Sequence, residues 1–187
     1  MPKILDIRTV YKGWATVSIA TIRGANGQVF ERLMEDHGRG VCVLPYDPDR
    51  KLATLVRQFR APVCATVAQV NLIEAVAGLI DNEGGACAVL REAFEETGLR
   101  LRNLDHVATV WTMPGISTER MDMFLATYSE SDRVGSGGGE AGEHEDITVE
   151  EMPLAALAKA ADEGRLEDMK ALALVQTLRL REPRLFR

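Results

Sequence analysis

The chain has 187 residues, of which 46% are hydrophobic and 27% are charged, and this predicts one domain over residues 1–187 with a single sizeable core. The formal net charge at pH 7 is −6, without a cluster of lysine or arginine, which argues against nucleic acid as a partner. Apolar runs fall short of the roughly 18–20 residues that a bilayer span requires, and no signal-peptide pattern opens the sequence, so we expect a cytoplasmic protein without a membrane partner.

The N-terminal part predicts an antiparallel meander. Residues 16–22 alternate apolar and polar side chains, Asn26-Gly27 is a hairpin signal, and residues 29–34 continue the alternation. Further strands are predicted over residues 41–44, 52–59, 72–77, 104–110, 121–128 and 147–152. Helices are predicted over residues 154–163 and 167–181, where apolar residues recur at helical spacing. A mixed sheet with helices packed against it is the economical architecture, so the predicted fold class is α/β.

Between the strands predicted at 72–77 and 104–110 lies a short helix rich in carboxylates. At 3.6 residues per turn Glu92, Glu95 and Glu96 crowd one face, and Gly98 ends the helix. The residues expected to face a core are Val89, Leu90, Ala93 and Phe94. Like charges at i, i+4 cost roughly 0.2–0.5 kcal/mol per pair, so the cluster indicates a shared cation. Oxygen ligands favour Mg²⁺, with Mn²⁺ as the alternative.

Residues 129–145 form a glycine-rich segment of low complexity. Its glycines offer no side chains to pack, which predicts an exposed loop tip. The segment ends in Glu143, His144 and Glu145, directly before an apolar strand. As an alternative, a mobile arm at this position could deliver carboxylates to a site.

Residues 78–99 resemble the signature of the Nudix hydrolases. The matching positions are Gly78, Glu83, Arg91, Glu92, Ala93, Glu95, Glu96, Gly98 and Leu99. Only residues 79–82 separate Gly78 from Glu83, one fewer than in the family's pattern. The resemblance implies an α/β/α sandwich with a mixed sheet, and hydrolysis that depends on a divalent metal.

Other stretches resemble the branch of this family that hydrolyses nucleotide sugars, namely the GDP-mannose hydrolases and the related ADP-ribose pyrophosphatases. They are residues 57–60, 72–83, 143–147 and 164–170. The leading prediction from this resemblance is hydrolysis of GDP-mannose to GMP and mannose 1-phosphate. The alternatives are hydrolysis of ADP-ribose to AMP and ribose 5-phosphate, and a sensor that binds nucleotide sugars without cleaving them. The resemblance also implies a homodimer with exchanged N-terminal strands, to which residues 1–40 contribute.

The resemblance assigns the metal ligands and the general base. The implied ligands are the side chains of Glu92, Glu96 and Glu145 and the backbone carbonyl of Ala77. Glu83 is expected to orient the site or to bind a secondary metal. Glu143 is implied as the general base, and Glu95 remains the alternative because spacing alone cannot separate the two. Arg91 is expected to pair with one of the carboxylates of the signature.

Residues outside the signature are expected to bind the substrate. By resemblance Arg60 is preferred to Arg57 as a phosphate ligand, and a solvated strand end is the alternative for both. Glu74 and Glu119 match positions where carboxylates accept hydrogen bonds from sugar or ribose hydroxyls, and an exposed strand residue is the alternative for each. Trp14 and Trp111 are expected in the core, as large apolar residues among strands.

Overall fold

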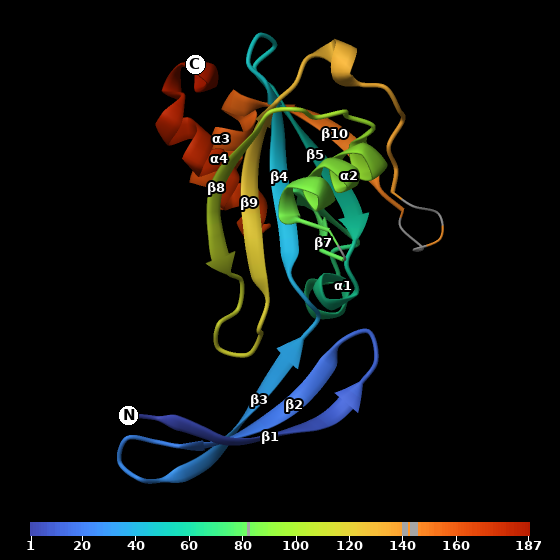
Figure 1. Ribbon diagram of the computed structural model, residues 1–187. Coiled ribbons are helices and arrows are strands. Elements are labelled where there is room, and N and C mark those ends of the chain that lie inside the picture. Colours follow the sequence, from blue (N-terminus) through green and yellow to red (C-terminus); the bar gives the residue numbers. More distant parts are fainter. Residues whose placement is uncertain (82, 140–141, 143–145) are drawn as a thin grey trace. The chain divides into compact units, whose positions relative to one another are not determined.

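The computed structural model describes residues 1–81, 83–139, 142 and 146–187 (Figure 1). The chain divides into two compact units, the first made of residues 1–40 and 109–121 and the second of residues 41–108 and 122–187. Within the described part of the chain, no helix is long and apolar enough to cross a bilayer. Of the predicted site residues that are described, Glu119 belongs to the first unit and the others to the second.

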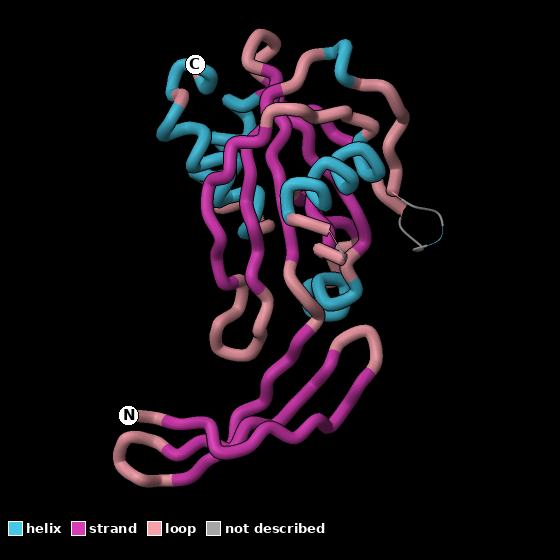
Figure 2. The backbone as a smooth tube through the Cα atoms, viewed as in Figure 1, coloured by secondary structure: helices cyan, strands magenta, loops and turns pink. Residues whose placement is uncertain are grey.

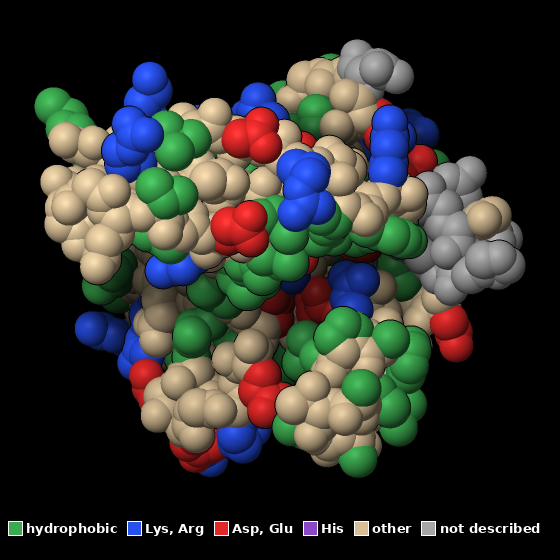
Figure 3. All heavy atoms as spheres, turned by 90° about the horizontal axis from the view of Figure 1, so that it is seen from below, with side chains coloured by type: hydrophobic (Ala, Val, Ile, Leu, Met, Phe, Trp, Pro, Cys, Tyr) green, Lys and Arg blue, Asp and Glu red, His purple; other side chains and the backbone are tan. Residues whose placement is uncertain are grey.

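The first unit contains the predicted antiparallel meander. Its strands β1 (Lys3–Lys12), β2 (Thr16–Arg23) and β3 (Val29–Asp36) form a three-stranded sheet in that order. The turn between β2 and β3 uses Gly27 at φ +81°, and the amide of Gly24 donates to the carbonyl of Gln28 at 2.8 Å. Strand β1 was not predicted, because its apolar residues do not alternate regularly and its side chains are all exposed. Hydrophobic side chains are visible at the molecular surface in Figure 3.

The second unit is built on a seven-stranded sheet (Figure 2). The path is β10-β5-β4-β9-β8, with β6 paired to β5 and β7 paired to β4. The bounds are β4 (Gly40–Asp47), β5 (Leu52–Phe59), β6 (Asn71–Glu74), β7 (Val76–Leu79), β8 (Leu104–Trp111), β9 (Arg120–Thr127) and β10 (Thr148–Pro153). The strand predicted over residues 72–77 is therefore two strands that pair with different neighbours.

Helices cover both faces of this sheet. Figure 1 shows α2 (Gly85–Thr97) in front of it, with α3 (Leu154–Asp162) and α4 (Met169–Arg181) behind. Val41 and Val43 of β4 pack in one buried cluster with Val89 and Ala93 of α2. Alternate strand residues such as Leu44 are fully buried and point to the opposite face. This arrangement confirms the predicted α/β fold with a sheet between helical layers.

Shorter helices complete the unit. Helix α1 (Ala61–Val67) follows β5 directly and has a proline in its first turn, a position that proline tolerates because the amide there has no helical partner. Helix α1 was not predicted from the sequence. The described residues also include the 3₁₀ helices η1 (Glu130–Asp132) and η3 (Pro183–Phe186).

Candidate active site

Helix α2 carries the glutamates that the sequence singled out. Val89 and Ala93 are fully buried, as expected, and the helix ends at Gly98, whose φ of +71° lets its amide donate to the carbonyl of Phe94 at 2.8 Å. The Phe94 side chain was expected in the core but is 44% exposed, because it lies beside the buried stripe rather than within it. Glu96 lies within that stripe and is only 1% exposed.

Glu92 and Glu96 both lie against strand β7. The Ala77 amide donates to Oε2 of Glu96 at 3.3 Å. A Cβ atom at Gly78 would lie 2.0 Å from the Glu92 carboxylate, so only glycine allows that side chain to approach the β7 backbone so closely. The structure thus brings two predicted carboxylate ligands beside Ala77 and Gly78 of β7, and the carbonyl of Ala77 was predicted as a third ligand.

These groups fit a hard divalent cation. Carboxylate and carbonyl oxygens are the ligands that Mg²⁺ and Mn²⁺ prefer. Within the described residues, His, Cys, Asp and Glu side chains do not gather in threes around a point that could hold a metal ion. Glu145, the third predicted carboxylate ligand, and Glu143, the predicted base, lie outside the described residues.

Arg91 compensates much of the negative charge on α2. Its guanidinium contacts Glu83 at 2.9 Å, Glu95 at 2.8 Å and Glu92 at 2.9 Å, and it also donates to the Leu79 carbonyl at 3.3 Å. Burial opposes its charge, but the hydrogen bonds to Glu83 and Glu95 and the charge of Glu92 outweigh burial and raise the pKa of Arg91. The expected pairing of Arg91 with signature carboxylates is therefore present. The glutamate cluster is stabilised by an internal cation before any metal binds.

Arg60 and Glu74 are bound to each other. Nε of Arg60 contacts Oε1 of Glu74 at 2.7 Å, and Nζ of Lys170 contacts Oε2 of Glu74 at 3.0 Å. Burial raises the pKa of Glu74, but the Arg60 hydrogen bond and the Lys170 charge outweigh it, so the net shift is downward. Glu74 is only 3% exposed, which excludes the alternative of an exposed strand residue.

Asp168 joins this pair to the start of α4. Its Oδ1 binds Nζ of Lys170 at 2.8 Å, while its Oδ2 accepts from the amides of Ala75 at 3.0 Å and Ala171 at 3.1 Å. Asp168 therefore caps α4 and also fixes the point where the chain passes from β6 to β7. Asp168 and Lys170 were given no role from the sequence, although both lie in the stretch 164–170 that resembles the nucleotide-sugar branch. The last helix was expected from residue 167, whereas α4 begins at Met169 with Asp168 as its N-cap, a position that Asp prefers.

The two remaining predicted substrate residues have protein partners as well. Arg57 forms a paired ion contact with Glu150 of β10. In the first unit, Glu119 accepts a hydrogen bond from Thr112 and contacts Nε2 of His37 at 3.2 Å.

Trp14 and Trp111, expected in the core, are exposed. Trp14 stacks on the ring of His37 with centroids 5.2 Å apart, and Arg120 lies over the ring of Trp111. Trp14 lies in the turn between β1 and β2, and Trp111 is the last residue of β8. Neither side chain therefore comes from the middle of a strand.

A cavity of about 360 Å³ opens elsewhere in the second unit, beside Arg100, Arg102, Thr127 and Tyr128. Within the described part of the chain, its lining includes none of the predicted site residues. The candidate site therefore rests on the geometry of α2 and β7 rather than on this cavity.

Comparison with known proteins identifies the family of the chain. The family model of the NUDIX domain matches residues 36–173. The chain belongs to the NUDIX family, as the resemblance of residues 78–99 predicted, and it is a hydrolase of that family.

The relatives support the assignment over most of the chain. The GDP-mannose pyrophosphatase of Cronobacter sakazakii is 38% identical over 155 residues, which cover 81% of this chain and 78% of the relative. The GDP-mannose pyrophosphatase of an Enterobacter species is 35% identical over 161 residues, covering 83% and 82%. A crystal structure of an ADP compounds hydrolase matches with a TM-score of 0.76 over 97% of this chain and 96% of that chain. At 18% identity, that likeness shows the fold alone.

Proposed function

We propose that the protein hydrolyses the diphosphate linkage of nucleoside diphosphate sugars with a divalent metal, and that GDP-mannose, giving GMP and mannose 1-phosphate, is its substrate. The observation that carries the proposal is the placement of Glu92 and Glu96 together against Ala77 and Gly78. The choice of GDP-mannose as substrate is supported by relatives named GDP-mannose pyrophosphatase, which are 38% and 35% identical to this chain. ADP-ribose is the second candidate, because residues 143–147 resemble the corresponding stretch of both enzymes of the branch.

The metal in this proposal is Mg²⁺, with Mn²⁺ as its substitute. It would be held by Glu92, Glu96 and the Ala77 carbonyl, with Glu145 as the third carboxylate. When bound, such an ion neutralises charge on the diphosphate oxygens and makes a water molecule more acidic. Buried Glu96 keeps its orientation through the Ala77 amide, and Arg91 contacts the Glu92 carboxylate at 2.9 Å.

The proton of the attacking water passes to a glutamate carboxylate in this scheme. We assign that role to Glu143, because the alternative, Glu95, has its carboxylate bound by Arg91 at 2.8 Å. Glu143→Gln should lower kcat by about a hundredfold or more, the scale of general base catalysis, and leave nucleotide-sugar binding unchanged. Glu95→Gln is the matched control. If Glu95→Gln loses kcat and Glu143→Gln does not, the assignment is reversed.

Arg60 is proposed to contact a phosphate of the substrate, and Glu74 to fix the direction of its guanidinium. The contacts of Glu74 with Arg60 at 2.7 Å and Lys170 at 3.0 Å support this division of roles. Arg57, which is paired with Glu150, remains the second candidate because the resemblance favours Arg60. Glu119 remains proposed for a sugar or ribose hydroxyl.

We also propose a homodimer formed through residues 1–40. Strand β1 is an edge of its sheet, and Ile4, Ile7 and Val10 on it are exposed. Exposed apolar edges are prone to pair with another chain, so a second copy is the partner they fit. Ile7→Glu should convert the dimer to a monomer in light scattering. A wild-type monomer at micromolar concentration with full activity would contradict the dimer.

A substrate panel tests the function. The protein is incubated with GDP-mannose, ADP-ribose and other nucleoside diphosphate sugars in Mg²⁺, and kcat/KM is compared across the panel. The proposal requires GDP-mannose to be the best substrate. A higher value for ADP-ribose would support the second candidate, and tight binding without any hydrolysis would make the protein a sensor.

A further inference from the structure

The C-terminal turn of α2 is held by a segment that follows far along the chain. The last four carbonyls of any α-helix lack helical partners. Here residues 133–139, which we call the glycine clasp, supply donors to them. The amides of Gly139 and Gly138 donate to the carbonyls of Glu95 at 3.1 Å and Glu96 at 2.9 Å. Nη1 of Arg133 donates to the Thr97 carbonyl at 3.0 Å.

The clasp requires glycine on both sides of the contact. Gly137 has φ +66°, and a Cβ atom there would lie 2.4 Å from the Glu96 carbonyl oxygen. A Cβ atom at Gly98 would lie 2.0 Å from the Gly135 carbonyl oxygen. These are backbone-to-backbone approaches, which a side chain would prevent. Residues 133–139 therefore form a loop, as predicted, but its backbone is bound to α2 and does not stand free at the surface.

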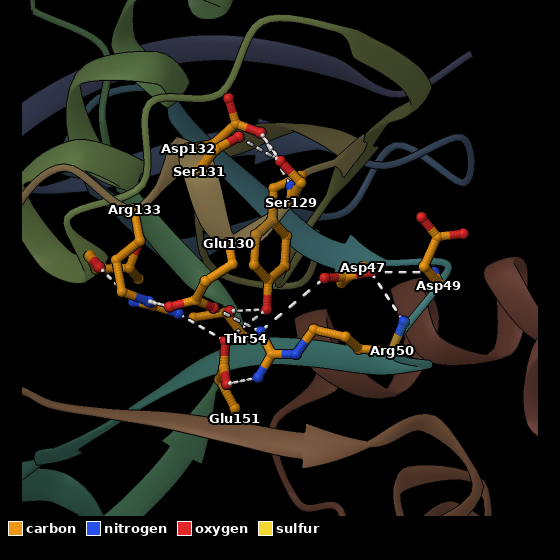
Figure 4. Close-up of polar contacts among 12 residues, drawn as sticks. Asp47, Asp49, Arg50, Thr54, Ser129, Glu130, Ser131, Asp132, Arg133 and Glu151 are labelled. Carbon is orange, nitrogen blue, oxygen red and sulfur yellow. Dashed lines mark hydrogen bonds and ion pairs between the residues drawn. The ribbon is translucent and has the colours of Figure 1, made fainter.

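Arg133 ties the clasp to the sheet. Its Nη2 contacts Oε1 of Glu151 on β10 at 2.7 Å. Figure 4 shows that the Glu151 carboxylate is also approached by Arg50, and its Oε1 accepts from the Tyr128 hydroxyl at 2.8 Å. Burial raises the pKa of Glu151, but the bonds from Arg50, Tyr128 and Arg133 outweigh it and lower the pKa to about 2. Glu151 is therefore a charged anchor at neutral pH.

We propose that Arg133 and residues 137–139 are positioning residues for the metal-binding carboxylates of α2. Glu96 is held at both ends, because its carbonyl accepts from the Gly138 amide while its carboxylate accepts from the Ala77 amide at 3.3 Å. A short α-helix is stiff and shifts as one body. A displacement of its last turn therefore moves Glu92 and Glu96 together relative to the Ala77 carbonyl. Mg²⁺ demands near-ideal octahedral geometry at about 2.0–2.1 Å, so a small shift weakens its binding. This inference rests on the proposed function.

The test compares Arg133→Ala with Arg50→Ala. Both arginines contact Glu151 at 2.7 Å, but only Arg133 donates to a carbonyl of α2. Three quantities are measured on the full chain: Mn²⁺ affinity by electron paramagnetic resonance, kcat and KM for GDP-mannose, and the unfolding midpoint. A residue that only stabilises the fold would lower the midpoint and leave Mn²⁺ affinity unchanged.

We expect both variants to lower the unfolding midpoint and only Arg133→Ala to weaken Mn²⁺ binding. The loss should be about tenfold or more, the range for groups that orient metal ligands, with a matching loss in kcat and an unchanged KM. Arg133→Lys, which keeps one donor, should restore part of the affinity. If Arg133→Ala does not fold, the affinity of Arg133→Lys decides, and a value equal to wild type overturns the proposal.

A second pair of variants tests the glycines. Gly137 and Gly164 have nearly the same backbone angle, φ +66° and +69°, but a Cβ atom meets the Glu96 carbonyl only at Gly137. Gly137→Ala should therefore weaken Mn²⁺ binding, whereas Gly164→Ala should only reduce stability. Equal Mn²⁺ affinity in the two variants would overturn the proposal. If wild type hydrolyses no nucleotide sugar, yet Mn²⁺ affinity falls selectively in Arg133→Ala and Gly137→Ala, the clasp stands and the proposed function fails.

Discussion

Lys170→Met should destabilise the fold, because Lys170 forms ion pairs with two buried carboxylates. Its Nζ lies 3.0 Å from Glu74 and 2.8 Å from Asp168, whose side chains are 3% and 6% exposed. Methionine keeps most of the side-chain length but removes the charge. The variant leaves Glu74 with Arg60 alone and Asp168 with its backbone amides.

The magnitude follows from these remaining partners. Removing one member of a buried ion pair costs about 3–5 kcal/mol when the other is left uncompensated. Both carboxylates keep another partner here, so we expect a loss of about 2–3 kcal/mol in the free energy of unfolding, at or just below the lower end of that range. For a chain of this size, that corresponds to about 4–12 °C in the unfolding midpoint.

Equilibrium unfolding in urea at neutral pH measures the effect. Lys159→Met is the matched control, because Lys159 lies 3.9 Å from Glu163 in an exposed pair. Such pairs contribute about 0–1 kcal/mol. The Glu74→Gln/Lys170→Met double variant should lose less than the sum of the single losses, because the two residues are in contact. A loss in Lys170→Met no larger than in Lys159→Met would refute the reasoning.

Two further changes test the charges around the site. Arg91→Met removes the cation shared by three glutamates. The variant should lose about 1.5–3 kcal/mol in the free energy of unfolding, the value of a hydrogen bond to a charged group. Added Mg²⁺ should raise its unfolding midpoint more than that of wild type, and equal midpoint shifts would contradict this. Glu151 has its pKa lowered from 4.5 to about 2, so its contribution is complete above pH 4.5 and is lost as pH falls toward 2. Glu151→Gln should therefore flatten the acid side of the stability profile, and an unchanged profile between wild type and variant would refute the ion-pair account.

Local patterns predicted the elements that depend on local physics. Strand β5 occupies residues 52–59 as expected, since an apolar run of strand length sits between turn residues. The glutamate helix was predicted from its spacing, and its core stripe through Val89 and Ala93 follows the same periodicity. The break between β6 and β7 was not predictable in this way. At this break the Ala75 amide donates to Asp168, a residue distant in sequence.

The partners of the candidate site residues were also beyond local reasoning. Arg60 and Glu74 were assigned separately to the substrate, yet they bind each other through a fold-dependent contact. The contact of the glycine clasp with α2 could not be predicted from a side-chain pattern, because it joins backbone atoms of Gly138 and Glu96. Low complexity in a sequence indicates missing side-chain packing, and that is compatible with an ordered backbone contact.

The most direct test of the central claim is the release of GMP from GDP-mannose as Mg²⁺ is titrated, measured for wild type and Glu96→Gln. Glutamine keeps an oxygen that can accept from the Ala77 amide but lacks the charge, so the variant should stay folded. We expect wild type to show saturable activation by Mg²⁺ with equal amounts of GMP and mannose 1-phosphate, and Glu96→Gln to show almost no release. Near-normal Mg²⁺-dependent release by the folded Glu96→Gln variant would contradict the assignment of this carboxylate to the metal.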